Sequence, residues 1–239
     1  MTEIKGGLLI DGKVRQDVIS NIEHGLLDLK KIKAIIIHQT DSYNASGTIS
    51  GWKNSKGNAR VGAHFLVDRG GDEFPESIED PPKSGKGKYT GKTRAYTGIE
   101  GKIYQTAHLN QICWHAGRLR DKKYPNNYNS IGIEFVGKYD YATQSYPLSS
   151  VGQLQSGAWL VKVLLELITT IPSMEAVYAH GVIAFKTPDM TEGGSTLEKI
   201  KEGVKPEEIK IESSCPEIIR QLFPYLCSQP SILSPKKNP

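Results

Sequence analysis

The segment KAIIIH, residues 33–38, decides how the rest of the chain is interpreted. A basic residue precedes an alanine and three consecutive isoleucines, and the segment ends on a histidine. β-Branched residues favour extended structure, and an apolar run without polar alternation indicates a strand that is buried on both faces. We therefore expect a central parallel strand that ends at His38, at the edge of the sheet where loops diverge and sites form.

Other short strands are expected before and after this segment. The opening residues 6–12 predict an apolar strand followed by an Asp-Gly turn, and residues 14–29 form an amphipathic stretch. The remaining strand candidates are residues 63–67, 102–105, 130–136 and 176–178. Together with the central strand, they predict one sheet assembled from distant parts of the chain.

A long helix is expected to begin after Ser149 or Ser150 as N-cap and to end near Ile168. An apolar stripe at helical spacing supports it: Leu154, Ala158, Val161, Leu165 and Ile168. Strands that alternate with a long helix favour the α/β class, with a central mixed β-sheet flanked by helices. The length of 239 residues allows one elaborated domain or two small ones.

Two stretches look like loop insertions. Residues 70–100 are polar and rich in glycine and proline, with five basic residues and no acidic one between Lys83 and Arg94. Such a long loop without regular structure is usually functional or mobile. Residues 187–214 contain the Gly193-Gly194 pair and an acidic, helix-prone middle.

Composition excludes several classes of protein. With 38% hydrophobic residues and three cysteines, the chain is neither disordered nor a multi-disulfide scaffold. The net charge of +4 is too small to select an anionic partner, and Tyr89 is the only aromatic residue within the basic stretch, so we expect no nucleic-acid partner. Charges interrupt every apolar stretch of spanning length and also residues 1–14, so we predict neither a membrane span nor a signal peptide.

Two histidines follow predicted strands. His38 and His180 could meet in one crevice, and neutral imidazoles are common zinc ligands. The alternative for His38 is a core histidine bonded to a backbone carbonyl, which is the commoner role for such a residue taken alone; for His180 it is an exposed loop position. A metal would need a third ligand, and the downstream candidates are Asp189, Glu192 and Cys215.

Glu134 lies in the middle of an apolar strand, on the same predicted face as Gly132. A carboxylate there is costly unless it is paired, exposed or functional. Near a metal, Glu134 could accept a proton from water and pass it to a leaving amine. An ion pair at the edge of the sheet is the alternative.

Aromatic residues and histidines suggest a binding wall. Trp114 and His115 stand beside basic residues and fit a sugar- or peptide-binding surface, although ordinary packing explains Trp114 equally well. His64 lies inside a predicted strand, where a structural role is more common than metal binding. We group His64, Trp114 and His115 as the candidate substrate-binding residues.

Six segments, taken together, resemble the zinc-dependent N-acetylmuramoyl-L-alanine amidases, which share their fold with phage amidase lysozymes and peptidoglycan recognition proteins. They are AIIIHQT (34–40), VGAHFLVDR (61–69), GKIYQTAHLN (101–110), CWHAGR (113–118), NSIGIEFVG (129–137) and AHGVIAFK (179–186). They follow the family's order and cover most of residues 31–220. The resemblance implies a single zinc amidase domain over residues 1–227 that contains both insertions, with a disordered tail over residues 228–239.

The resemblance also implies roles for single residues. His38 resembles the first zinc ligand, His180 the second, Glu134 the catalytic glutamate of some branches, and Lys186 the lysine that holds the scissile carbonyl oxygen. His115 matches a position that lines the groove without binding metal. Some relatives carry a tyrosine where this chain has Ala63, and its absence gives Glu134 more weight.

The third ligand departs from the family pattern, which places Cys-Pro or Asp-Pro two residues after the lysine. Pro188 occupies that place, and Asp189 comes one residue late. Cys215-Pro216 reproduces the dipeptide after a long insertion and could open a helix. We therefore predict Cys215 as third ligand, with Asp189 as the alternative and Glu192 after both.

By resemblance, the chain hydrolyses the amide between N-acetylmuramic acid and L-alanine of the stem peptide. The alternative is a non-catalytic peptidoglycan-binding module, because the recognition branch of this fold often lost a zinc ligand. The expected partners are peptidoglycan or muropeptides and an inhibitor or immunity protein. Action is expected in the periplasm or on the cell wall, after delivery by a secretion system or by phage lysis.

Overall fold

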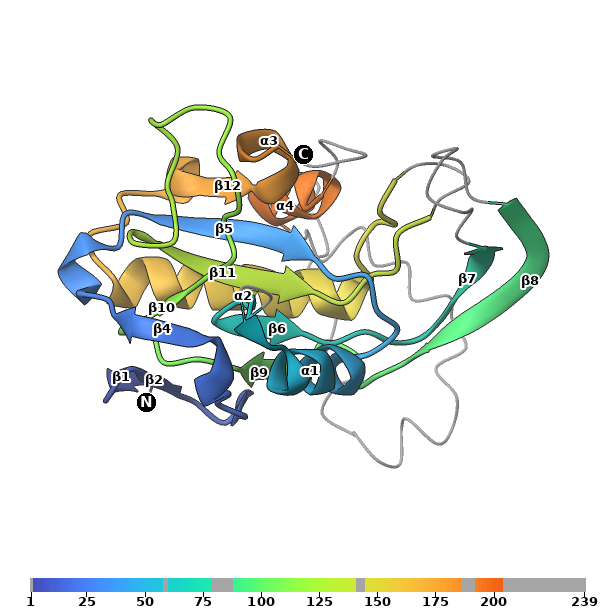
Figure 1. Cartoon of the computed structure of the whole chain (residues 1–239), viewed down its shortest axis with the longest axis horizontal. Helices are drawn as coiled ribbons and strands as arrows, with labels where there is room; N and C mark the ends of the chain where they lie inside the picture. The colour runs from blue at the N-terminus through green and yellow to red at the C-terminus, as the bar shows by residue number, and fades with distance from the viewer. Residues whose placement is uncertain (1, 58–59, 79–87, 141–144, 186–191, 204–239) are drawn as a thin grey trace, which may run out of the picture. The chain divides into compact units, whose positions relative to one another are not determined.

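A mixed β-sheet forms the centre of the protein. The computed structural model describes residues 2–57, 60–78, 88–140, 145–185 and 192–203, and within them six strands pair in the order β12-β5-β11-β6-β9-β3 (Figure 1). Their bounds are β3 (Val14–Gln16), β5 (Ala34–Gln39), β6 (Phe65–Val67), β9 (Ile103–Gln105), β11 (Ser130–Phe135) and β12 (Val177–Ala179). β5 runs parallel to both β11 and β12, which confirms the predicted central parallel strand and the mixed α/β sheet.

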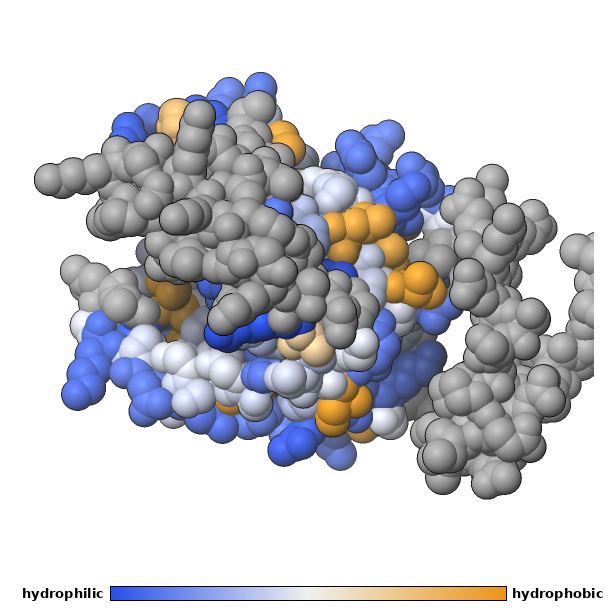
Figure 2. All heavy atoms as spheres, turned by 90° about the vertical axis from the view of Figure 1, so that its right-hand side faces the viewer, coloured by the Kyte–Doolittle hydropathy of each residue, from blue (hydrophilic) through white to orange (hydrophobic). Residues whose placement is uncertain are grey.

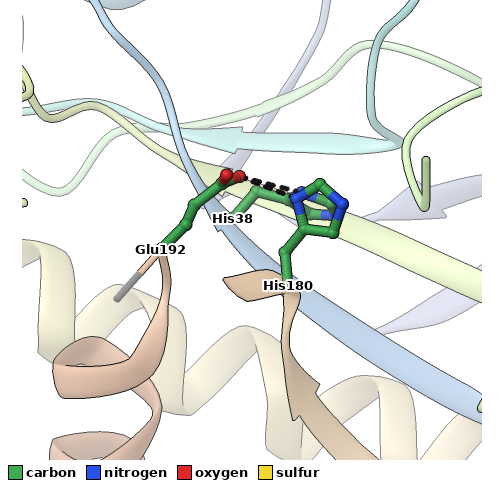
Figure 3. Close-up of side chains that lie close together, drawn as sticks. All are labelled: His38, His180 and Glu192. Atoms are coloured by element: carbon green, nitrogen blue, oxygen red, sulfur yellow. Dashed lines mark hydrogen bonds and ion pairs between the residues drawn. The ribbon is translucent and has the colours of Figure 1, made fainter. Parts of the chain in front are cut away.

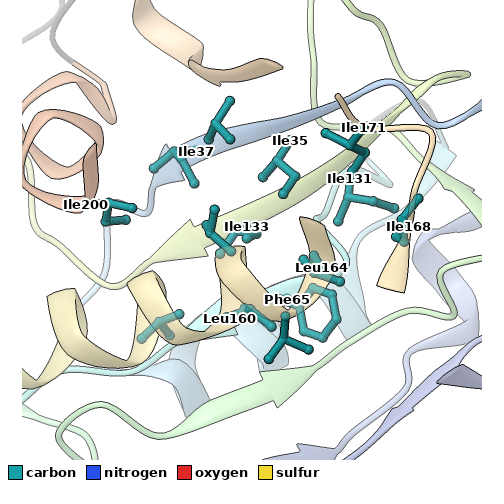
Figure 4. Packing of buried hydrophobic residues seen from close by; sticks show 14 of the residues in the cluster. Ile35, Ile37, Phe65, Ile131, Ile133, Leu160, Leu164, Ile168, Ile171 and Ile200 are labelled. Carbon is teal, nitrogen blue, oxygen red and sulfur yellow. The ribbon is translucent and has the colours of Figure 1, made fainter. Parts of the chain in front are cut away.

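Helix α2 (Val151–Leu167) covers one face of the sheet (Figure 1). Its predicted start is confirmed, because the Ser150 hydroxyl accepts a hydrogen bond from the Gln153 N–H while the Gln153 side chain accepts one from the Ser150 N–H. Buried side chains of α2 and of the sheet form one hydrophobic cluster (Figure 4), which includes Ile35, Ile37, Phe65, Ile131, Ile133, Leu160 and Leu164. Each such side chain contributes roughly 1.5–3 kcal/mol by its burial.

The face of the sheet opposite α2 carries a different set of side chains. Because Ile35 and Ile37 point toward α2, Ile36 and His38 point away from it. Two helices lie on this side: α1 (Ala45–Asn54), capped by Asn44, and the short α3 (His180–Ile183). Strand β10 (Gln111–Cys113) pairs there with β4 (Glu23–Leu26) as a two-stranded sheet. The candidate site therefore lies on the side of the sheet that α2 does not cover.

The first predicted insertion is not an irregular loop. β7 (Gly70–Ile78) and β8 (Lys88–Thr97) pair antiparallel as a separate two-stranded ribbon, which extends away from the main sheet in Figure 1. The prediction of a loop was wrong because neither segment contains the apolar run or alternation by which a strand is recognised in a sequence. Figure 2 faces this end of the molecule, and the hydrophobic side chains visible between the grey atoms form several separate patches.

Part of the second predicted insertion belongs to the core. Helix α4 (Gly194–Glu202) confirms the helix-prone character of this stretch, and its Leu197 and Ile200 are buried in the same cluster as α2. This part is therefore a core helix and not a loop. The predicted tail and Cys215 lie outside the described residues.

Short elements complete the described chain. The amphipathic residues 14–29 contain β3, β4 and the single-turn 3-10 helix η1 (Ser20–Ile22), and they lead into a second one, η2 (Leu29–Lys31). β1 (Glu3–Lys5) pairs with β2 (Leu8–Ile10), and η4 (Met174–Ala176) leads into β12. Among the helices described, none combines the length and apolar character needed to cross a membrane.

Candidate metal centre and active site

Three buried side chains from distant parts of the sequence meet beside the ends of β5 and β12. His38 lies near the end of β5, His180 directly follows β12, and Glu192 precedes α4 (Figure 3). Glu192 Oε1 lies 2.9 Å from His180 Nδ1 and 3.3 Å from His38 Nδ1. Because β12 pairs in parallel with β5, the ends of both strands lie at one edge of the sheet, as the sequence predicted for the two histidines.

Gly193 makes the position of Glu192 possible. Its φ of +79° favours glycine, and a Cβ atom there would lie 2.3 Å from the carbonyl oxygen of Ile37. The Gly193 N–H donates to the Gln39 side chain at 3.1 Å, and the Glu192 carbonyl accepts from the Gly181 N–H at 2.9 Å. The backbone around Glu192 is therefore attached to the segments that carry both histidines.

Glu192 is a carboxylate in this site although its side chain is buried. Burial alone would raise the pKa of Glu192, but hydrogen bonds from His180 and then His38, together with their positive charge, hold the pKa well below its usual value. The cluster therefore presents an anionic oxygen to two imidazole rings. Nitrogen and carboxylate oxygen are both zinc ligands.

The hydrogen-bond partner of His180 Nε2 shows which ring nitrogen of His180 carries the proton. Its Nε2 lies 3.1 Å from the carbonyl oxygen of Ala116, which can only accept, so Nε2 carries the proton. In a neutral ring, the Nδ1 lone pair then faces the Glu192 carboxylate. Such an arrangement is favourable when a cation, either a proton or a metal ion, lies between the two atoms.

The three donors fit a metal ion. Their ligand atoms all lie within 4.8 Å of one another, and all three residues are buried. In a tetrahedral zinc site, ligand atoms are about 3.3 Å apart, close to the separations of Glu192 from both rings. A His-His-Glu cluster that could bind a metal is therefore present among the described residues.

Glu134 lies next to this cluster. It pairs in register with His38 across the parallel strands β11 and β5, so the two side chains share one face of the sheet. Both line a cavity of about 370 Å³, together with His180 and Glu192. The cavity also has an aromatic wall, to which Trp52 and Trp114 contribute.

Trp114 and His115 line the cavity, as the sequence analysis expected of substrate-binding residues. The Trp114 ring stacks on His24, with ring centroids 3.8 Å apart and planes at 7°. His115 is buried, and its Nδ1 lies 3.1 Å from His38 Nε2. Burial, and then the positive charge of neighbouring histidines, keeps the pKa of His115 well below its usual value.

His64 does not contribute to the cavity wall. Its side chain is fully buried, one ring nitrogen lies 3.0 Å from the carbonyl oxygen of Gln111, and the other accepts from the Gly132 N–H at 3.1 Å. Burial lowers the pKa of His64 to about 4. The structure thus places His64 in the buried position that the structural alternative implied, away from the lining of this cavity.

Among the three candidate third ligands, Glu192 lies with the histidines. Lys186, Asp189 and Cys215 lie outside the described residues. Glu192 was the last of the three in the sequence-based order, although two glycines follow it and helix α4 begins at the second of them. A glycine pair that opens a helix was the available signal. Sequence reasoning also missed Trp52 and Asn127, which line the cavity.

Comparison with known proteins identifies the family. The sequence profile described as N-acetylmuramoyl-L-alanine amidase matches residues 28–193, and the chain belongs to this family. It is therefore a peptidoglycan amidase, which hydrolyses the amide between N-acetylmuramic acid and L-alanine of the stem peptide. The resemblance predicted from the six segments is confirmed. No curated protein matches the chain.

Several solved structures are similar to this chain at low sequence identity, and AmpD supports the same fold. A selenomethionine derivative of AmpD is 15% identical, with 82% of this chain and 98% of that chain covered and a TM-score of 0.53. A mutant endolysin from Bacillus subtilis is 23% identical, with coverages of 70% and 82% and a TM-score of 0.43. AmiD from E. coli, in complex with anhydro-N-acetylmuramic acid-L-Ala-D-gamma-Glu-L-Lys, is 23% identical, with coverages of 76% and 57% and a TM-score of 0.42.

Proposed function

We propose that the chain is a zinc amidase whose metal is held by His38, His180 and Glu192. The observation that carries this proposal is the convergence of two Nδ1 atoms on one buried carboxylate oxygen, at 2.9 and 3.3 Å. Two histidines and a glutamate form an established ligand set for catalytic zinc, with a further position open to water. Glu192 thus replaces Cys215 and Asp189 as the proposed third ligand.

Glu134 is the proposed general base and acid. Bound zinc supplies Lewis acidity and a water whose pKa is lowered to about 7. Glu134 stands one strand away from His38 in the same cavity, where its carboxylate can accept the proton of the attacking water. The same group then donates a proton to the departing nitrogen of L-alanine.

Two further roles complete the proposed site. Lys186, by family resemblance, stabilises the negative charge that develops on the scissile carbonyl oxygen. Trp114 and His115 contact the muropeptide, because both line the cavity beside the metal centre. Trp114 is suited to this task, since its stacking on His24 fixes the ring plane.

The cellular setting is also a proposal. The family's substrate bond lies in peptidoglycan, so we propose that the enzyme acts in the periplasm or on the cell wall, after delivery by a secretion system or by phage lysis. An inhibitor or immunity protein would then be its partner in the producing cell. Co-purification of such a protein from that cell would support this setting.

The test is digestion of intact sacculi and of soluble anhydro-muropeptides, each with and without a chelator, followed by mass analysis. We expect release of stem peptides that begin with L-alanine, loss of this release with chelator, and recovery when zinc is restored. Release that persists after complete removal of metal would contradict the zinc mechanism. Binding to sacculi without release, by a zinc-loaded protein, would favour the non-catalytic peptidoglycan-binding module.

A further inference from the structure

A chain of hydrogen bonds behind the metal centre joins the Asn126 carbonyl, Ser130, His115 and His38. The carbonyl oxygen at its end can only accept, and this fixes which atom donates in each bond. The Ser130 hydroxyl lies 2.6 Å from the carbonyl oxygen of Asn126, which can only accept, so the Ser130 proton points there. Toward His115, Ser130 Oγ therefore presents lone pairs. His115 Nε2 lies 3.4 Å from Ser130 Oγ and must carry a proton to bond with it.

The same reasoning fixes the donor in the hydrogen bond between His115 and His38. A neutral imidazole has one donor and one acceptor nitrogen, so a proton on His115 Nε2 leaves a lone pair on its Nδ1. His38 Nε2 lies 3.1 Å from that Nδ1 and must be the donor. When the His38 ring is neutral, its Nδ1 lone pair then faces Glu192, which is the tautomer that a metal ligand needs.

Ala116, the residue after His115, fixes the tautomer of His180. The carbonyl oxygen of Ala116 accepts from His180 Nε2 at 3.1 Å and leaves the Nδ1 of His180 facing Glu192. Two adjacent residues, His115 by its side chain and Ala116 by its backbone, thus set the tautomers of both metal-binding histidines. Their mutual placement decides whether both Nδ1 atoms converge.

Asn127 holds these two residues together. Its Oδ1 accepts from the N–H of His115 at 2.9 Å and from the N–H of Ala116 at 2.7 Å. Gly132 provides the space for the His115 ring, because a Cβ atom at Gly132 would lie 2.8 Å from both Cγ and Nδ1 of that ring. Ser130 is inaccessible and His115 is 8% exposed, so water does not compete freely for the hydrogen bond between them, whereas Asn127 is only half-buried.

We propose that His115 and Asn127 are positioning residues that fix the Nε2–H tautomers of His38 and His180, and so direct both Nδ1 atoms at the metal. This inference rests on the metal centre proposed above. It assigns His115 a role beyond lining the cavity, since the ring nitrogen nearest the centre is committed to His38. We call the hydrogen-bond chain from Ser130 through His115 to His38 the relay. Its loss should weaken metal binding before it affects any contact with the muropeptide.

The first test is zinc affinity, measured by competition with a chromophoric chelator on the full chain. We expect His115→Leu and Asn127→Leu to weaken zinc binding by roughly 10- to 100-fold, as loss of an outer hydrogen-bond partner usually does. His115→Asn keeps an acceptor near the Nδ1 position, and Asn127→Asp keeps the Oδ1 acceptor, so both should bind zinc far more tightly than the Leu variants. His108→Gln removes a histidine that pairs with Glu23 elsewhere and should leave the affinity unchanged.

The second test is direct observation of the ring tautomers by ¹⁵N–¹H correlation of histidine side chains, with and without zinc. The relay requires the proton of His115 on Nε2 in both states, and Ser130→Ala should release that preference without removing the ring. A proton on His115 Nδ1, or wild-type zinc affinity in a folded His115→Leu, would overturn the proposal. If the wild-type chain binds no zinc, the proposed function fails, while the tautomer of His115 still decides the relay independently.

Discussion

Glu134 on β11 lies directly opposite His38 on β5, because these parallel strands pair in register from Ser130 with Ala34 to Phe135 with Gln39. Residues paired in this way present their side chains on the same face of the sheet. The proposed base therefore stands beside the first proposed metal ligand without the involvement of any flexible loop. A site built on two rigid strands keeps its geometry better than one built on loops.

Glu134→Gln should retain zinc and lose turnover. The amide keeps the shape of the carboxylate but cannot accept the proton of the attacking water, so we expect stem-peptide release to fall by roughly 10²- to 10⁴-fold. Mass analysis of released peptides and metal analysis of the purified variant measure the two quantities separately. Near-normal release by the zinc-loaded variant would remove Glu134 from the mechanism.

Glu192→Gln should lose zinc. Loss of an outer hydrogen-bond partner weakens metal binding by up to roughly 100-fold. Because Glu192 is proposed to bind the metal directly, we expect the zinc affinity of this variant to fall by at least that factor. Cys215→Ser and Asp189→Asn are the matched variants, and both should bind zinc with wild-type stoichiometry. The opposite pattern, with zinc lost in Cys215→Ser and kept in Glu192→Gln, would restore Cys215 as the third ligand.

Gly193→Ala should disrupt the metal centre through the backbone. The substitution places a Cβ atom 2.3 Å from a backbone oxygen of β5 at a residue with φ of +79°, so α4 must move and carry Glu192 away. We expect a loss of about 1–3 kcal/mol in the free energy of unfolding together with weaker zinc binding. Denaturant unfolding and chelator competition report the two effects.

Gly194→Ala is the control for that variant. This residue begins α4 and lies outside the positive-φ region, and an added Cβ would have no atom within 4 Å beyond its chain neighbours and its own helix backbone. Alanine is a better helix former than glycine, so unfolding free energy should stay the same or rise slightly. If the two substitutions change unfolding free energy and zinc affinity equally, the effect of Gly193→Ala comes from the composition of the helix and not from the close approach of Gly193 to β5.

The sequence predicted the elements whose patterns are strong and local. The isoleucine run of β5, the alternation in β11 and the capped stripe of α2 each depend on burial that the residues themselves reveal. The β7–β8 ribbon was missed because residues 70–78 and 88–97 contain neither the apolar run nor the apolar alternation that indicates a strand in a sequence. Local pattern therefore identifies core elements better than elements that project from the core.

The candidate site was predicted in part. Strand ends identified His38 and His180, because topology alone brings the ends of parallel strands together. The choice among third ligands was less predictable, since Glu192 reaches the histidines through the path of the backbone at Gly193, a tertiary feature. His64 and His115 illustrate the same limit, because only packing decides which histidine ring turns toward the cavity.

Shortening the β7–β8 ribbon should change substrate choice without unfolding the protein. The base of the ribbon is anchored, since Tyr96 is buried and its hydroxyl accepts from the Lys138 N–H at 3.1 Å, so replacing residues 75–93 by a short turn spares this contact. We expect unchanged thermal unfolding and altered relative rates on intact sacculi and soluble muropeptides. An unchanged ratio of the two rates would exclude the ribbon from substrate selection.

His64 makes the stability of the protein depend on pH. Its buried ring has a pKa of about 4 in the folded state, below the ordinary value of 6.5. Protonation is opposed by burial, and a proton on the nitrogen that accepts from the Gly132 N–H would also break that hydrogen bond. The unfolded chain has no such restriction and binds a proton near the ordinary pKa.

The contribution of His64 should therefore be fully present above pH 6.5 and be lost as the pH falls from 6.5 to about 4, because the unfolded state binds more protons in this window. The pKa difference corresponds to about 3 kcal/mol of unfolding free energy. His64→Gln cannot titrate and should show a shallower decline than the wild type, the remainder arising from groups such as His115, whose pKa is lowered in the same direction. Urea unfolding of both proteins across pH 4–8 measures the difference, and parallel stability curves would rule out His64 as its source.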